Sequence, residues 1–206
     1  MKLRTTPAIL QEWLPRLPGL ARLHEIAATF YAGTRSRDEA RSDVIDVIAG
    51  RLQCSRVSLW RFDGAPGALR LLCLASKATG AALVTSERCL HEAEYRDYFD
   101  VLVRTGMYAS HDAMHDPHLQ PMRENYLLPG KVLSMLDSAF TVNGRAYGMV
   151  CCEQTDRRRD WHAEEIRDLR ALVATLALLM AAAGDEALWA SPSRPMAPVF
   201  RRSQEP

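Results

Sequence analysis

The amino-acid sequence predicts an α/β fold, an α+β sandwich with a central antiparallel sheet of about five or six strands and helices on both faces. The strongest observation is Asn143-Gly144, which lies between two β-rich runs and tolerates the positive φ angles of a two-residue type I′ turn. After this hairpin the apolar period changes from strand-like to helix-like. The order of strands and helices along the chain completes the pattern.

The N-terminal part of the chain predicts an irregular leader followed by two amphipathic helices. Residues 1–19 are interrupted by prolines. Apolar residues at helical spacing predict helices over residues 20–31 and 39–52, and Ser36 or Asp38 is expected to cap the second helix. Both helices are expected to pack their apolar faces against other elements.

The remaining elements follow from β-rich runs, turn residues and the change of period. A strand at 56–62, a turn at 63–67 and a strand at 68–75 form the first pair. The expected later elements are a helix at 92–105, a short strand at 107–110, an excursion over 111–131 with a helix around 118–127, hairpin strands at 133–142 and 145–154, and a final helix from about Trp161 to Ala183. Residues 184–206 are rich in Pro and Ser and predict a disordered tail.

Composition limits the possible function classes. The chain has 206 residues, of which 48% are hydrophobic, and this suits one domain with a substantial core. The net charge is +1, so no overall field favours nucleic acid or an anionic membrane. The longest apolar stretch, residues 169–183, contains Arg170 and is too short to span a membrane. Without a signal-peptide pattern or a CxxC pair among its five cysteines, the chain is expected to be cytoplasmic with free thiols.

Four segments in this order give the chain a family resemblance. They are RVSLWRFD at 56–63, SHDAMHDP at 110–117, NGRAYGMVCCE at 143–153 and RRDWHAEEIRDL at 158–169. Together they resemble the GAF domain, a small-molecule-binding module of bacterial signalling proteins. The set is most similar to GAF domains that precede histidine kinases and diguanylate cyclases. The resemblance covers about residues 20–183, between the leader and the tail.

The resemblance implies a stand-alone sensory domain that binds a small molecule and signals through its terminal helices. The first and last helices would lie together, form a homodimer and pass the change to a signalling partner protein. A module that mediates dimerisation without any ligand is the alternative. No nucleic acid, membrane or enzymatic activity is expected, and the sequence identifies no cofactor.

The ligand is expected between the sheet and the loop-rich cover formed by residues 92–128. Asp137 is the most diagnostic position, because a charge inside an apolar strand needs either a ligand or an arginine as its partner. The candidate pocket residues are Trp60, Leu72, Tyr95, Tyr98, Phe99, Asp112, Met135, Asp137 and Cys152.

Three histidines form the weak candidate for a metal site. His111, His115 and His118 alternate with aspartates, and these residue types suit zinc. Pro117 prevents the segment from forming a simple helical face. We therefore expect no metal, and the family resemblance implies that Asp112, Asp116 and Pro117 shape the loop, with the Asp side chains accepting backbone hydrogen bonds.

The cysteines suggest two further chemistries, and neither is favoured. Cys89-Leu90-His91 is similar to a bilin attachment site, but an intervening Leu separates the Cys from the His. Reduction of free methionine sulfoxide would need two thiols close together, such as Cys73, Cys89 or Cys152. Cys151 and Cys152 point to opposite faces of their strand, so one thiol is expected to line the pocket and the other to pack under a helix.

Overall fold

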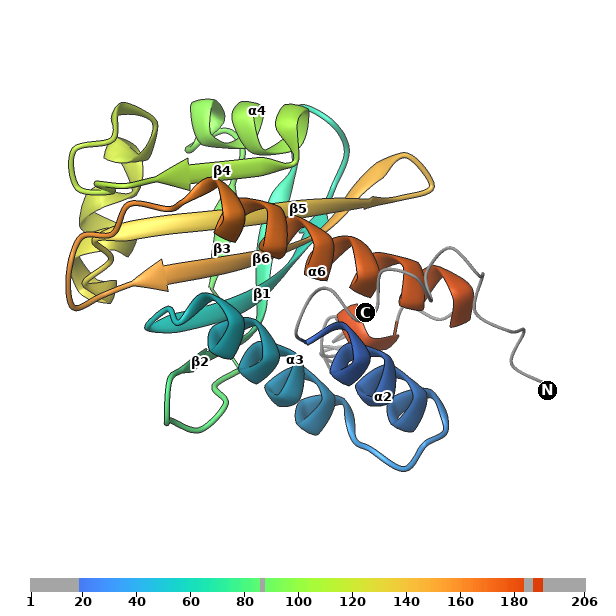
Figure 1. Ribbon diagram of the computed structural model, residues 1–206. Helices are drawn as coiled ribbons and strands as arrows, with labels where there is room; N and C mark the ends of the chain where they lie inside the picture. Colours follow the sequence, from blue (N-terminus) through green and yellow to red (C-terminus); the bar gives the residue numbers. More distant parts are fainter. Residues whose placement is uncertain (1–18, 86–87, 184–186, 191–206) are drawn as a thin grey trace, which may run out of the picture.

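The computed structural model describes residues 19–85, 88–183 and 187–190, and a six-stranded sheet lies at its centre (Figure 1). The strands are β1 (Arg56–Asp63), β2 (Arg70–Ala78), β3 (Cys89–His91), β4 (Met107–Ser110), β5 (Ser134–Val142) and β6 (Arg145–Gln154). Their order across the sheet is β3-β2-β1-β6-β5-β4, and every neighbouring pair is antiparallel. The predicted fold class is confirmed.

Helices cover both faces of this sheet (Figure 1). In chain order they are α2 (Leu20–Tyr31), α3 (Arg37–Leu52), α4 (Arg96–Thr105), the 3-10 helix η1 (Pro117–Met122), the π-helix η2 (Arg123–Leu127), α5 (Leu128–Gly130), α6 (Ala163–Ala183) and the 3-10 helix η3 (Ala187–Trp189). The long helices α2, α3 and α6 pack on one face, which we call the α6 face. The α4 face is covered by α4 and the short segments η1 and η2. The sheet therefore separates two hydrophobic cores.

The hairpin between β5 and β6 has the predicted turn. Asn143 and Gly144 have φ angles of 51° and 75°, which a type I′ turn requires. A β-bulge then shifts the register, because Phe140 pairs with Gly148 whereas Thr141 pairs with Ala146. Beyond the bulge, on the side away from the turn, each residue of β5 pairs with a residue one position further along β6 than the pairing next to the turn would give without the bulge.

The two helix ends that shape the α6 face follow from specific side chains. The hydroxyl of Ser36 accepts a hydrogen bond from the backbone N–H of Glu39, and the carboxylate of Glu39 accepts from the N–H of Ser36, so a capping box begins α3. Before α6, the guanidinium of Arg159 lies 4.5 Å from the ring centre of Trp161 and pairs with Glu165. These contacts fix where both helices begin.

The structure corrects several predicted elements on the α4 side. Residues 92–95 form a turn, so α4 begins at Arg96. Strand β3 was missed because it has three residues and no apolar alternation. The expected helix around residues 118–127 is instead a 3-10 segment followed by a π-helix, since Pro121 inside the segment removes an N–H donor that an α-helix needs.

The predicted disordered tail is wrong for residues 187–190. These residues form η3 and bury Leu188 and Trp189 in the core of the α6 face. The rest of the tail and the leader over residues 1–18 lie outside the described residues. Within the part of the chain that is described, no helix is long and apolar enough to cross a membrane.

Candidate functional site

A network of buried polar side chains lies on the α4 face of strands β5 and β6. Asp137 is directly opposite Cys151, and Met135 is opposite Glu153. Asp137 and Glu153 are both completely inaccessible to solvent. We call Asp137, Tyr98, Glu153, Tyr126 and Arg56 the buried polar network, because contacts among them cross from the sheet to its cover. Two carboxyl groups at the floor of a core are costly and need explanation.

Asp137 is the least satisfied member of this network. The hydroxyl of Tyr98 donates to its Oδ2 atom at 2.7 Å, whereas Oδ1 is buried and accepts no hydrogen bond. Burial raises the pKa of Asp137 to about 7, and hydrogen bonds from the Cys151 thiol and from the Tyr98 hydroxyl oppose that shift. The neighbouring Cys151 thiol is only a weak donor, so the buried carboxyl group keeps the capacity to accept a hydrogen bond from a stronger one.

Glu153 is the better satisfied carboxylate. It accepts a hydrogen bond from the hydroxyl of Tyr126 at 2.8 Å and forms an ion pair with Arg56. Burial alone disfavours the charge of Arg56, but the adjacent Glu153 carboxylate raises the pKa of this guanidinium above its ordinary value. Arg56 also donates to the carbonyl of Gly130 at 3.4 Å. These bonds tie the cover segments η2 and α5 to the sheet.

Aromatic rings surround the network. The ring centres of Trp60 and Tyr126 are 6.2 Å apart, and those of Tyr98 and Tyr108 are 5.0 Å apart. The indole N–H of Trp60 donates to the hydroxyl of Ser58 at 2.7 Å, which orients the ring. Burial raises the pKa of both Tyr98 and Tyr126, so both stay protonated and remain donors. The surroundings therefore suit a planar group that presents a hydrogen-bond donor.

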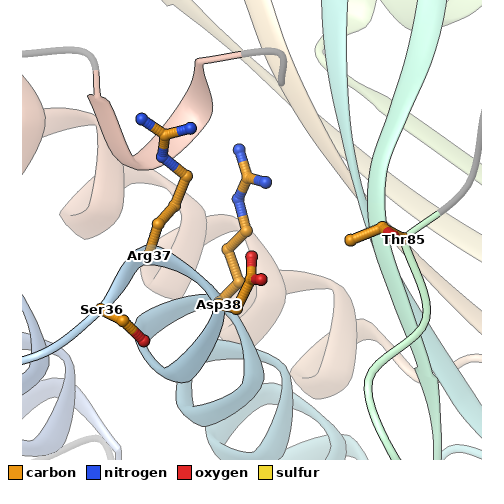
Figure 2. A pocket seen from close by; sticks show the side chains of 5 residues that line it. Ser36, Arg37, Asp38 and Thr85 are labelled. Carbon is orange, nitrogen blue, oxygen red and sulfur yellow. The ribbon is translucent and has the colours of Figure 1, made fainter. Parts of the chain in front are cut away.

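Side chains fill the space between the sheet and this cover. Six candidate residues from the sequence, namely Trp60, Tyr95, Tyr98, Phe99, Met135 and Asp137, are buried here. Two hollows of about 310 Å³ and 360 Å³ lie at the surface instead. The first is bordered by Arg37 of α3 and by Thr85 (Figure 2). The second lies along α4, and neither includes Asp137.

Three of the candidate residues lie elsewhere. Cys152 points into the core of the α6 face, and Cys151 takes the position beside Asp137. The β-bulge causes this difference, because an unbroken ladder would place Cys152 on the same face as Asp137. Leu72 is half-buried and lies between two residues of the α4-face core, so strand alternation turns it to the other side. Asp112 lies at the edge of the fold, 3.0 Å from the guanidinium of Arg158.

Sequence reasoning missed much of the network. Glu153 is not among the candidate residues from the sequence, but it is fully buried beside them. Its alternation with Cys151 and Met149 in β6 was a signal for the same face. Tyr126 and Arg56 had no comparable signal, because a π-helix in the cover brings Tyr126 to Glu153, and a tertiary contact brings Arg56 to Gly130.

The three histidines do not converge on one point. The ring of His111 accepts a hydrogen bond from the backbone N–H of Trp161 at 2.9 Å, and the ring of His115 lies 3.0 Å from the carboxylate of Asp112. His118 lies near the ring of Tyr108. Among the described residues no group of three or more His, Cys, Asp or Glu side chains is placed to hold a metal ion. Asp116 accepts from the N–H of His118 at 3.0 Å, as predicted for a residue that shapes the loop.

The cysteines offer no activated thiol pair. The sheet separates Cys73 on the α4 face from Cys152 on the α6 face. Burial raises the pKa of Cys73 to about 11, which opposes formation of a thiolate. Cys89 is half-buried, and its sulfur lies 3.6 Å from the ring nitrogen Nε2 of His91. Burial raises the pKa of Cys89 as well.

Comparisons with known proteins agree with this architecture. Residues 36–180 match the GAF domain family. A phycoerythrobilin-bound GAF domain from a cyanobacterial phytochrome is 14% identical, with a TM-score of 0.61 over 82% of this chain and 97% of that one. The blue-light-absorbing form of the Thermosynechococcus elongatus PixJ GAF domain is 19% identical, with a TM-score of 0.57 over 79% and 89% of the two chains.

A third structure comes from a different kind of protein. The GAF domain of an Acinetobacter phosphoenolpyruvate-protein phosphotransferase is 16% identical, with a TM-score of 0.58 over 80% of this chain and 94% of that one. At these identities the likeness shows the shared fold. No curated protein matches the sequence.

Proposed function

Because the chain belongs to the GAF domain family, we propose that it is a sensory domain that binds a small molecule at the buried polar network. The observation that carries this proposal is the buried Oδ1 atom of Asp137, which accepts no hydrogen bond in an aromatic-lined core. A ligand with an N–H or O–H donor would satisfy this atom and offset part of the cost of burying the carboxyl group.

The nature of the cover supports the same site. Where α2, α3 and α6 close the other face, the network is closed by Tyr98 of the ten-residue helix α4 and by the short segments η1, η2 and α5. Such segments separate from a sheet at a smaller free-energy cost than long helices do, because they make fewer buried contacts. A π-helix such as η2 is also frequent at functional sites. Ligand entry would displace η2 and open the packed interior around Tyr126.

The proposed output passes through the terminal helices. Helices α2 and α6 lie side by side on the α6 face (Figure 1), and Leu178 of α6 is 53% exposed. A homodimer formed along α6 would bury this side chain and place the two helices at the interface to a signalling partner. The proposal includes no catalytic step, no metal and no nucleic acid. Five free thiols suit a cytoplasmic location.

Dimerisation without a ligand is the second candidate function. Side chains fill the interior beneath η1 and η2, so the domain needs no ligand to complete its core. In this case the exposed Leu178 would lie in the functional surface, and the buried polar network would serve only to position the segments that cover the sheet.

A thermal-shift screen with metabolites and nucleotides tests the proposal, because a compound that binds the native state raises Tm. A compound that binds at the network should lose about tenfold or more in affinity with Asp137→Asn, which replaces one carboxyl oxygen with an amide NH2 group that cannot accept a hydrogen bond. The matched control is Cys152→Ala, which removes a buried side chain of the opposite face and should leave affinity unchanged.

Three outcomes would decide against the site. A compound whose affinity is unaffected by Asp137→Asn binds somewhere else. Equal losses in the Asp137→Asn and Cys152→Ala variants indicate a general loss of stability. If native mass spectrometry detects no bound molecule, no compound raises Tm, and Leu178→Arg converts a dimer to a monomer, the dimerisation function replaces the sensory one.

A further inference from the structure

The chain returns to the α6 face after helix α6, and the returning segment is tightly bound there. Figure 1 shows this short piece, near the red end of the colour scale, close to α3. Leu188 and Trp189 are almost completely buried. We call residues 187–190 the C-terminal latch. The family match ends at residue 180, so the latch lies beyond the segment shared with other GAF domains.

Hydrogen bonds made by the side chains of Trp189 and Arg41 hold the latch. The indole N–H of Trp189 donates to the backbone carbonyl of Trp60 at 2.7 Å. The guanidinium of Arg41 donates from Nε to the carbonyl of Leu188 at 2.9 Å and from Nη2 to the carbonyl of Ala190 at 2.6 Å. Arg41 is 2% exposed, and burial lowers its pKa to about 10. If the latch left, this buried cation would lose both of these carbonyl acceptors.

The sheet beneath the latch is shaped to accept it. Gly148 lies under the indole of Trp189, and a Cβ atom at this position would lie 2.4 Å from both Trp189 Nε1 and Phe140 Cζ. The rings of Phe140 and Trp189 pack edge to face, with centres 5.2 Å apart. Gly148, Phe140 and Arg41 together form a binding site for the latch and its tryptophan.

Trp60 connects this binding site to the buried polar network. Its carbonyl binds the latch, whereas its ring lies in the core of the α4 face beside Tyr126. A β-bulge interrupts the β1–β2 ladder beside Trp60, where Leu59 pairs with Ala75 and Trp60 pairs with Cys73, whereas the ladder between β1 and β6 is unbroken there. One residue of a central strand, next to a bulge, thus contacts both sites.

We propose that the C-terminal latch couples the occupancy of the ligand site to the C-terminal end of the domain. A ligand that displaces the Trp60 ring moves the Trp60 carbonyl, weakens its bond to Trp189 and releases residues 187–190. Release would expose Leu188 and Trp189 to a partner protein. The coupling rests on the proposed function, but the latch is tested without a ligand.

Limited proteolysis of the full chain with chymotrypsin, followed by intact mass analysis, tests the latch itself. Cleavage after Leu188 or residue 189 requires release. The Trp189→Phe variant removes the N–H donor and leaves Leu188 unchanged, so cleavage after Leu188 should be about tenfold faster than in the wild type, because cleavage follows the open population. Cleavage within α6 reports global unfolding and should not change. A latch cut equally fast in both proteins overturns the proposal.

A second pair of variants tests the coupling from the opposite face. Ser58→Ala removes the acceptor that orients the Trp60 indole, and it should speed latch cleavage by about threefold through a larger open population. The control, Tyr108→Phe, lies in the same core without a ring contact to Trp60 and should leave the rate unchanged. Equal rates in the two variants overturn the coupling. If Ser58→Ala also speeds cleavage within α6, Trp60→Phe replaces it with the same expectation.

The two proposals fail in different ways. If Asp137→Asn abolishes ligand binding while Trp189→Phe leaves latch cleavage unchanged, the ligand site stands and the latch does not. If no compound binds at Asp137 but Ser58→Ala still releases the latch, the two faces are coupled, and the signal that uses this connection is not a ligand of the network.

Discussion

The two faces of the sheet are both buried, but they differ in the helices that cover them and in the side chains that they bury. On the α6 face, three helices of twelve or more residues bury aliphatic side chains such as Leu136, Val150 and Leu172. On the α4 face, one long helix and several short segments cover aromatic rings and two buried carboxyl groups. The strands that supply both faces are the same, and alternate residues of β5 and β6 point into each core.

This difference shows that the same strands can bury a mostly apolar face or a partly polar one. Replacing a buried ion pair with apolar side chains is often neutral or stabilising. The stability of the fold therefore does not by itself account for Glu153 and Arg56 at these positions. The α6 face shows the apolar alternative on the same strands. Among the described residues, the charged side chain buried on that face is Arg41, and it binds the C-terminal latch. On both faces, buried charge marks a place where we propose function.

The largest expected effect compares adjacent residues that point to opposite faces. Leu136→Ala should lower the free energy of unfolding by about 4 kcal/mol, because long helices cannot collapse into the cavity. Met135→Ala on the α4 face should lower it by about 2 kcal/mol, since short cover segments can close in. Urea denaturation measures both values. Equal losses would mean that the α4 cover is as rigid as the helical layer.

The next prediction tests the cost of the ion pair. Arg56→Met leaves the Glu153 carboxylate buried without its cation and should destabilise the protein by about 3 kcal/mol. The double variant Arg56→Met/Glu153→Leu should recover most of this loss, to within about 1 kcal/mol of the wild type. Thermal and urea unfolding of the three variants and the wild type provide the comparison. No recovery in the double variant would show that the pair stabilises the fold.

The third prediction concerns the pH dependence of stability. Burial raises the pKa of Asp137 to about 7, above its unfolded value of about 4, so the folded state keeps a proton that the unfolded state loses. Stability should therefore fall as pH rises from 4 to 7, by on the order of 1 kcal/mol per pH unit, and level off above pH 7. The Asp137→Asn variant removes this group. Parallel stability profiles for the variant and the wild type between pH 5 and 8 would contradict a raised pKa.

The sequence predicted the sheet well because its signals are local. Asn143-Gly144 defines its own turn, and alternation within β5 identifies Asp137 as an unusual buried charge. The position of Cys152 could not be predicted, because a bulge between Phe140 and Thr141 reverses which residues of β6 share the face of Asp137. The sequence of the hairpin has no feature that specifies such a one-residue shift.

Tertiary contacts explain the other errors. Glu153 is buried because a π-helix brings Tyr126 over it, and no periodic pattern in residues 118–127 predicts that geometry. Residues 187–190 are bound on the α6 face because Arg41, which lies far away in the sequence, donates hydrogen bonds to two of their carbonyl groups. A composition rich in Pro and Ser describes the tail as a whole, but it does not predict that Trp189 is buried against the sheet.

The smallest expected effect lies outside both cores, at the histidines of the edge loop. Asp112 pairs with His115 and Arg158 at the surface, and exposed pairs of this kind contribute about 0.5 kcal/mol or less. His115→Ala should therefore change the free energy of unfolding by less than about 0.5 kcal/mol. A bound metal would behave differently, because its binding free energy adds to the stability of the folded state. We expect Tm to be the same with EDTA, with added zinc and with neither, because these exposed polar groups contribute little to the stability of the folded core. A drop of several degrees with EDTA would instead indicate a metal site at this edge of the fold.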